Sequence, residues 1–231
     1  MSNETIGVGF DIDHTIAIDN KLERVAFLRL LEQIVDDGGR MLGNLNDEIA
    51  HVDELLAAQR SGVFTIGEAV RRFAVDRGVA PSDAYVARFT EMALDMVAEF
   101  VIPLPGARQT FAGLRARGIA IAVLSNGWNP LQIRKARRAG FDGPVLASAD
   151  LGVQKPHCGA FAALLDVLGT APGNTWYVGD DPLCDIEGAR AAGLRSVWLD
   201  AEGRQYPSEI AAPTLAIHSL EAIVGALEVP C

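Results

Sequence analysis

The stretch Phe10-Asp11-Ile12-Asp13-His14-Thr15 decides the expected fold, because it joins a short apolar run to two acidic residues. The run that leads into it, residues 6–10, has the composition of a buried strand. Asp11 and Asp13 follow directly where that strand should end. In open parallel sheets, ligands bind beyond the carboxyl ends of the strands. Both carboxylates are therefore candidates for a functional site.

The part of the chain from residue 119 onward alternates between short apolar runs and helical stretches. Glycines such as Gly140, Gly169 and Gly193 are placed to end these helices. This alternation predicts an α/β fold, a Rossmann-like parallel sheet core with helices on both faces. Besides residues 6–10, strands are expected at residues 119–124, 144–148, 174–178 and 194–199.

The stretch between about residues 22 and 100 has a different pattern of apolar residues. Its apolar residues recur at helical spacing in four segments, which are separated near residues 36–39, 61–62 and 78–81. A four-helix unit is therefore expected as an insertion directly after the first strand. The expected organisation is a core domain of residues 1–20 and 101–231 and an inserted α-helical cap domain of residues 21–100.

Polar residues follow each of the strands that should share the carboxyl edge of the sheet. They are Asp11 and Asp13, then Ser125 and Asn126, then Lys155, and finally Asp180, Asp181 and Asp185. Carboxylates held close together repel one another, so their pKa values rise unless a cation compensates. Mg²⁺ binds to one or two carboxylates together with substrate oxygens. The sequence therefore predicts a magnesium site at this edge.

These strand-end residues also carry a resemblance to a known family. The chain resembles the haloacid dehalogenase-like (HAD) hydrolase superfamily, specifically its phosphatases with a helical cap inserted between the first and second motifs. The resemblance spans roughly residues 6–200 and implies a magnesium-dependent phosphomonoester hydrolase that acts on a small phosphorylated metabolite. The matching motifs, in the family's order, are Asp11-Ile12-Asp13-His14-Thr15, Leu124-Ser125-Asn126-Gly127, Gln154-Lys155-Pro156, and Gly179-Asp180 with Asp185.

The resemblance implies catalytic and metal-binding roles for the acidic residues. Asp11 would attack phosphorus and form an aspartyl-phosphate. Asp13 would protonate the leaving alkoxide and then activate the water that hydrolyses the intermediate. Mg²⁺ would be held by the carboxylates of Asp11 and Asp180 and by the backbone carbonyl of Asp13. Asp185 would lie close by, acting through water or through Lys155.

The resemblance implies supporting roles for the remaining motif residues. Ser125, the backbone N–H of Asn126 and Lys155 would hold the phosphoryl oxygens. Thr15 would brace the loop that carries Asp13 through a side-chain hydrogen bond.

For some residues near the motifs, the sequence allows two interpretations. Asp181, followed by Pro182, suits a helix N-cap better than a metal ligand. His14 is expected to face solvent, although it could line the cap hinge, and Trp128 could belong to the core or contact the cap or the substrate. The basic run at residues 134–138 is expected to be a solvated helix face. Basic residues of the cap could contact a second anionic group of the substrate, but most of them are expected to be solvated: Lys21, Arg24, Arg60, Arg71 and Arg72.

Several other functions compete with a phosphatase. A haloacid dehalogenase also uses an aspartate nucleophile, but it needs no Mg²⁺ and lacks an acid at the second aspartate, so Asp13 and Asp180 argue against it. A sugar-phosphate mutase would share the site and differ only in water access, which the sequence leaves open. A non-catalytic binding module would be expected to have lost Asp11 or Asp13. A phosphorelay receiver would leave the helical insertion unexplained.

Bulk composition narrows the expected partners and location. The net charge of −10 argues against a nucleic-acid surface. No apolar run approaches the ~18 residues that a membrane helix needs, and no signal peptide is expected at the N-terminus. Cys158, Cys184 and Cys231 lack metal-ligand spacing, which favours reduced thiols in a cytoplasmic protein. A monomer and a homodimer are both compatible with the sequence.

Overall fold

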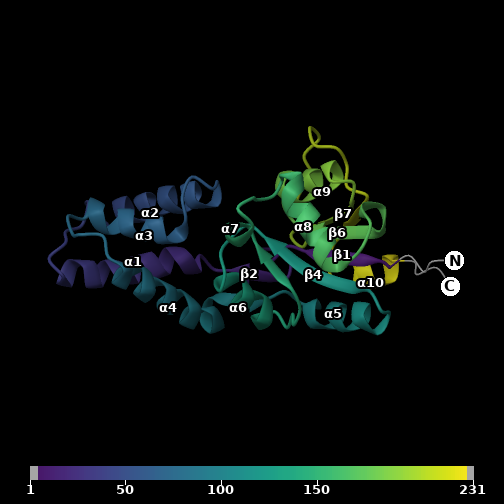
Figure 1. Cartoon of the computed structure of the whole chain (residues 1–231), viewed down its shortest axis with the longest axis horizontal. Helices are drawn as coiled ribbons and strands as arrows, with labels where there is room; N and C mark the ends of the chain where they lie inside the picture. Colours follow the sequence, from purple (N-terminus) through teal and green to yellow (C-terminus); the bar gives the residue numbers. More distant parts are fainter. Residues whose placement is uncertain (1–4, 228–231) are drawn as a thin grey trace. The chain divides into compact units, whose positions relative to one another are not determined.

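The computed structural model describes residues 5–227 and divides the chain into two compact units (Figure 1). One unit contains the residues up to Ile18 and those from Ile102 onward, and the other is Asp19–Val101. The division expected from the sequence, at residues 20/21 and 100/101, lies close to these boundaries. The chain passes between the units through β2 (Ala17–Asp19) and β3 (Val101–Pro103), which pair with each other.

The larger unit is built on a six-stranded parallel sheet with the strand order β5-β4-β1-β6-β7-β8. β1 lies between β4 and β6, so Asp11 leaves the sheet near the middle of its carboxyl edge. The parallel core and five of its strands confirm the prediction, and β8 was not anticipated. The strands are β1 (Gly7–Phe10), β4 (Ala120–Ser125), β5 (Val145–Ala147), β6 (Thr175–Gly179), β7 (Arg195–Leu199) and β8 (Leu215–Ile217).

Helices cover both faces of this sheet (Figure 1). A short 3₁₀ turn, Pro172–Asn174, precedes β6, and a single π-helical segment, Pro182–Glu187, runs into α9. The helices are α5 (Ala107–Ala116), α6 (Leu131–Arg138), α7 (Ser148–Leu151), α8 (Cys158–Leu168), α9 (Gly188–Ala191) and α10 (Ala222–Ala226).

The two faces of β1 pack against different helices. A Cβ atom on Gly9 would lie only 2.5 Å from Leu164 of α8 and 2.8 Å from Tyr177 of β6, so glycine permits the close approach of α8. Side chains alternate along a strand, and Phe10 therefore points to the opposite face. There it makes an edge-to-face contact with Phe111 of α5. β1 is thus enclosed on both faces, which fixes the position of the residues that follow it.

The smaller unit contains four helices, as predicted. Its core includes the aromatic rings of Phe27, Phe73 and Phe89, with Phe27 in contact with the other two. Glu48 and Arg77 form an ion pair inside it, and both side chains are fully buried. The helices are α1 (Leu22–Asp36), α2 (Leu45–Arg60), α3 (Ile66–Asp76) and α4 (Asp83–Phe100). None of the helices in residues 5–227 is both long and apolar enough to cross a membrane.

Four of the arginines of this unit pair with carboxylates of the same unit. The nitrogen–oxygen distances are 2.5 Å for Arg24–Asp53, 3.5 Å for Arg60–Glu23, 2.7 Å for Arg71–Asp83 and 3.0 Å for Arg72–Glu68. Glu23 is buried, but its partner Arg60 and the side chains of the other three pairs are partly exposed, so each pair contributes about 1 kcal/mol or less to stability.

Candidate active site

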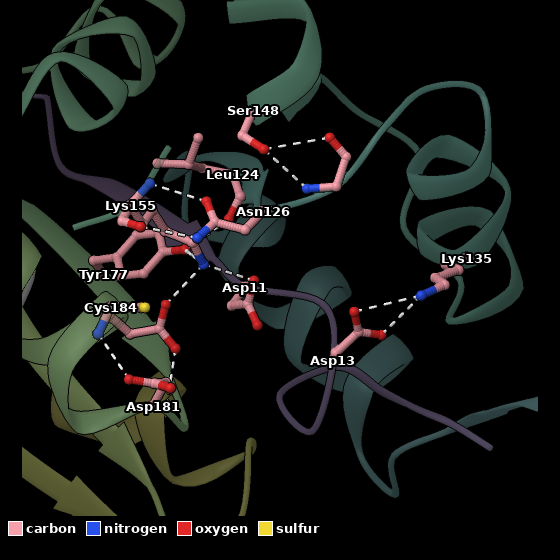
Figure 2. Close-up of polar contacts among 12 residues, drawn as sticks. Asp11, Asp13, Leu124, Asn126, Lys135, Ser148, Lys155, Tyr177, Asp181 and Cys184 are labelled. Atoms are coloured by element: carbon pink, nitrogen blue, oxygen red, sulfur yellow. Dashed lines mark hydrogen bonds and ion pairs between the residues drawn. The ribbon is translucent and has the colours of Figure 1, made fainter. Parts of the chain in front are cut away.

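Lys155 lies at the centre of a buried polar cluster at the carboxyl edge of the sheet (Figure 2). Its ammonium donates hydrogen bonds to Oδ1 of Asp11 at 2.7 Å, to Oδ1 of Asp185 at 2.7 Å and to the hydroxyl of Tyr177 at 2.9 Å. The Tyr177 hydroxyl in turn donates to the carbonyl of Leu124 at 2.7 Å. An ammonium group has three donors, so these contacts use all of them.

Burial and charge act against each other in this cluster. Burial lowers the pKa of Lys155, but the carboxylates of Asp11 and Asp185 more than offset this and raise that pKa well above its usual value. Burial raises the pKa of Asp11 and of Asp185, and the nearby ammonium of Lys155 opposes both shifts. One cation therefore serves two buried carboxylates, and negative charge at the edge of the sheet is only partly compensated.

The side chain of Asn126 holds the backbone of Lys155 in place. Its Nδ2 donates to the carbonyl of Lys155 at 2.9 Å, and the Lys155 N–H donates to its Oδ1 at 2.9 Å. Ser125, which ends β4, is buried beside it. Gly127 follows, and its N–H donates to the hydroxyl of Ser148 at 3.0 Å. The sequence indicated a backbone role for Asn126; this side-chain role was not anticipated.

Asp11, Asp180 and Asp185 form an acidic group that could hold a metal ion. Each offers one carboxylate oxygen, and these oxygens lie within 4.8 Å of one another. Burial, together with the charge of Asp11, raises the pKa of Asp180 to about 7, although Arg204 lies 3.4 Å from its Oδ2 and opposes the shift. Hard oxygen ligands and uncompensated negative charge fit a hard divalent cation.

Asp181 caps the helical segment that follows it, as predicted. Its Oδ1 accepts hydrogen bonds from the backbone N–H groups of Leu183 at 2.8 Å and Cys184 at 2.7 Å. Its own N–H donates to Oδ2 of Asp185 at 3.0 Å. Within residues 5–227, Asp181 is not part of the acidic group formed by Asp11, Asp180 and Asp185. The cap therefore fixes the turn from which Asp185 points to Lys155.

The loop that carries Asp13 is closed by backbone hydrogen bonds. The carbonyl of Ile12 accepts from the N–H groups of Thr15 at 3.2 Å, Ile16 at 2.9 Å and Ala17 at 3.0 Å. The prediction that Thr15 braces this loop through a side-chain hydrogen bond is wrong. The buried hydroxyl of Thr15 has no hydrogen-bond partner among residues 5–227. The backbone turn does the bracing instead. His14, with a φ of 58°, is exposed as expected.

Lys135 corrects the prediction that the basic run of residues 134–138 is entirely solvated. Its side chain is only 2% exposed, and its ammonium lies 3.1 Å and 3.4 Å from the two carboxylate oxygens of Asp13 (Figure 2). Lys135 follows the buried Leu131 by four residues and so shares its face of α6. The other basic residues of the run are exposed: Arg134, Arg137 and Arg138.

The remaining candidates have structural roles or lie outside the described part. Trp128 is buried, with an exposed fraction of 5%. Burial and the carboxylate of Asp181 raise the pKa of Cys184 to about 11, which leaves it protonated and unreactive near neutral pH. Cys158 is exposed and free, and Cys231 lies outside the described residues.

Comparisons with known proteins agree with the fold. The chain is similar to the phosphoserine phosphatase of Thermus thermophilus, with 38% identity over 122 residues, 52% of this chain and 49% of that protein. It therefore spans about half the length of that relative. Two solved structures share its fold with a TM-score of 0.73: a HAD phosphatase from Thermococcus onnurineus (22% identity, covering 96% of this chain and 97% of that one) and a 2-haloacid dehalogenase from Pseudomonas syringae (24%, 96% and 98%).

A family model covers most of the chain. The model described as haloacid dehalogenase-like hydrolase matches residues 7–193. This range contains the strand ends that deliver Asp11, Asn126, Lys155 and Asp180 to one edge of the sheet. The chain belongs to the haloacid dehalogenase-like hydrolases.

Proposed function

We propose that this hydrolase is a magnesium-dependent phosphomonoesterase, which acts on a small phosphorylated metabolite through an aspartyl-phosphate at Asp11. The observation that carries the proposal is the arrangement around Asp11. This carboxylate shares Lys155 with Asp185 and also belongs to the acidic group with Asp180. A nucleophile, a cation and a candidate metal site thus meet at the end of one strand.

Two carboxylates would divide the chemistry between them. Asp11 attacks the phosphorus of the bound monoester, the bond to the leaving oxygen breaks, and the phosphoryl group is held as an aspartyl-phosphate. Asp13 gives a proton to the leaving oxygen, and it then takes a proton from the water that hydrolyses the intermediate. The side chain of Asp13 is 36% exposed, which suits a proton carrier.

Cationic and hydrogen-bonding groups would stabilise the phosphoryl oxygens during transfer. Lys155 is already held beside Asp11 by Asn126 and Tyr177, so its positive charge would lie next to the phosphoryl group without moving. Ser125 and the backbone N–H of Asn126 lie at the end of the neighbouring strand β4 and would donate to the same oxygens.

The metal proposed here is Mg²⁺, held by Asp11 and Asp180, the backbone carbonyl of Asp13 and, directly or through water, Asp185. When bound, it would supply positive charge that orients the phosphoryl group and neutralises charge during transfer.

Mg²⁺ affinity is expected to decrease as the pH falls below about 7. Asp180, whose pKa is raised to about 7, then carries a proton that the ion must displace. Below that value the apparent association constant should fall by up to about tenfold per pH unit. Above it, the constant should level off. Calorimetric titration with Mg²⁺ in two buffers of different ionisation enthalpy measures both affinity and proton release; equal affinity across this range, without proton release, would contradict the assignment of Asp180.

Dehalogenation is the second candidate, because one of the structural neighbours is a 2-haloacid dehalogenase. A halide leaves carbon without needing a proton, and its displacement from carbon needs no metal ion. Asp13 and the acidic group that includes Asp180 would then have no chemical task. These two features favour phosphoryl transfer.

A panel of phosphorylated metabolites, assayed for phosphate release with Mg²⁺ and with a chelator, tests this function. Phosphoserine belongs in the panel because one relative is a phosphoserine phosphatase. Sugar phosphates and nucleoside monophosphates should accompany it, together with a haloacid assayed for halide release. Magnesium-dependent phosphate release is expected. Halide release without phosphate release would instead support the dehalogenase.

A further inference from the structure

We propose that Lys135 of α6 is a positioning residue, which holds the carboxyl group of Asp13 in the orientation needed for proton transfer. This inference rests on the proposed function, because it concerns the acid–base step of phosphomonoester hydrolysis. The four sequence motifs do not include Lys135, and the basic run that contains it does not predict a role in the site.

The contact between Lys135 and Asp13 is specific. The two residues are 122 positions apart in the chain, and the ammonium lies within 3.4 Å of both oxygens of the carboxylate. The Lys135 side chain is 2% exposed, whereas that of Asp13 is 36% exposed. A buried ammonium loses hydration, and such a group is found where a partner compensates. Lys135 therefore has a structural reason to stay on Asp13 rather than to move into solvent.

Each of the two aspartates of the first motif has its own lysine. In Figure 2 the carboxyl of Asp11 meets Lys155, while that of Asp13 meets Lys135. The three donors of Lys155 are occupied by Asp11, Asp185 and Tyr177, so it offers no further hydrogen bond to Asp13. Lys135 thus supplies positive charge next to Asp13 that Lys155 does not.

An orientation fixed in this way matters most when the leaving group is a strong base. General acid catalysis depends on the distance and direction between the acid and the leaving oxygen. A weakly basic leaving group departs without a proton and is insensitive to that geometry. Loss of Lys135 should therefore slow the release of basic leaving groups far more than that of weakly basic ones. A lysine that only stabilised the fold would affect all substrates alike.

The test compares kcat/KM of wild type and Lys135→Met for p-nitrophenyl, phenyl and benzyl phosphate with Mg²⁺. These substrates are alike in shape and increase in leaving-group basicity in that order. Because kcat/KM reports steps up to release of the leaving group, it isolates the acid step. The expected result is that Lys135→Met loses about 10-fold or more in kcat/KM for benzyl phosphate relative to p-nitrophenyl phosphate. Lys135→Arg, which keeps the charge and the donors, should recover most of this ratio.

Two further variants separate positioning from folding. Arg137→Met removes a charge from the exposed face of the same helix and should leave the ratio unchanged. Combining Lys135→Met with Asp13→Asn should cost little beyond Asp13→Asn alone, because residues that act through one another are not additive. If Lys135→Met does not fold, Lys135→Gln takes its place and should shift the ratio in the same direction by a smaller factor.

The opposing results are distinct. Equal losses on all three substrates, or a full additional loss in the Asp13→Asn background, would overturn the positioning role of Lys135. A gain in activity on benzyl phosphate would also overturn it, because Lys135 would then hold Asp13 away from the leaving oxygen. Absence of magnesium-dependent hydrolysis by the wild-type protein would overturn the proposed function, and this inference with it.

Discussion

The Asp11→Asn variant is expected to lose about four orders of magnitude or more in kcat while remaining folded. Asparagine keeps the size of aspartate, but its amide cannot form the aspartyl-phosphate, and removal of a covalent nucleophile has effects of this size. The change also removes one carboxylate from the group with Asp180 and Asp185, so weaker Mg²⁺ binding should accompany it. Initial rates with the best phosphomonoester of the panel, at several Mg²⁺ concentrations, measure both effects.

Asp181 offers a matched control for the same substitution. This residue caps the segment Pro182–Glu187 and, within residues 5–227, is not part of the acidic group. Asparagine is as good a helix cap as aspartate, so Asp181→Asn should retain activity. If Asp11→Asn kept more than about a tenth of the wild-type rate, covalent catalysis at Asp11 would be excluded. Removal of a nucleophile normally lowers kcat far more than tenfold.

The Lys155→Met variant should show the second large effect, on stability as well as on rate. Its side chain is 3% exposed and compensates Asp11 and Asp185, which are also buried. Removing one partner of a buried ionic group strands the other charges and costs about 3–5 kcal/mol in the free energy of unfolding. Loss of a cation that stabilises phosphoryl oxygens should also lower kcat by about a hundredfold or more.

Mg²⁺ separates these two consequences of Lys155→Met. The ion would neutralise part of the stranded carboxylate charge, so the variant should regain stability on Mg²⁺ addition more than the wild type does. It should not regain activity, because the ammonium next to Asp11 is still missing. Urea denaturation with and without Mg²⁺ measures the first effect, and Arg137→Met serves as an exposed control. A Lys155→Met protein as stable as the wild type in the absence of metal would show that the buried cluster is not organised by this lysine.

Much of the fold follows from local sequence patterns. Each of the five predicted strands has an apolar run, and such runs are specific when they alternate with helices. β8 (Leu215–Ile217) is as short as β5, but no helix separates it from β7, so the alternation of strands and helices does not mark it. It is ordered by pairing with β7, a contact between distant parts of the chain. Local patterns carry no information about such pairing.

The candidate site also contains residues that the sequence predicted and residues that it did not. Motif spacing identified Asp11, Lys155, Asp180 and Asp185, because strand ends converge on one edge of a parallel sheet. The partners that orient these residues were not predictable. Tyr177 lies inside a strand and reads as a core aromatic, yet its hydroxyl accepts a hydrogen bond from Lys155. Its role depends on which face of β6 turns toward Lys155, which only the three-dimensional packing decides.

Lys135 shows why a charge pattern can mislead. Four of the five residues from 134 to 138 are basic, and such a run normally faces solvent. On a helix, however, neighbouring residues point in different directions. The position of Lys135 four residues after Leu131 was a usable signal of burial, but its partner, Asp13, is 122 residues away. The identity of that partner could not be obtained from α6 alone.

Detection of a phosphoenzyme tests the central claim most directly. In the Asp13→Asn variant the proton carrier is lost, so hydrolysis of the aspartyl-phosphate should be slower than its formation from an activated monoester such as p-nitrophenyl phosphate. Incubation with this substrate and Mg²⁺, followed by acid quench and peptide mass spectrometry, should show a hydroxylamine-sensitive phosphoryl group on Asp11. The same peptide should be unmodified without Mg²⁺. An active enzyme whose Asp13→Asn variant carries no phosphoryl group, or carries it on another residue, would contradict Asp11 as the nucleophile.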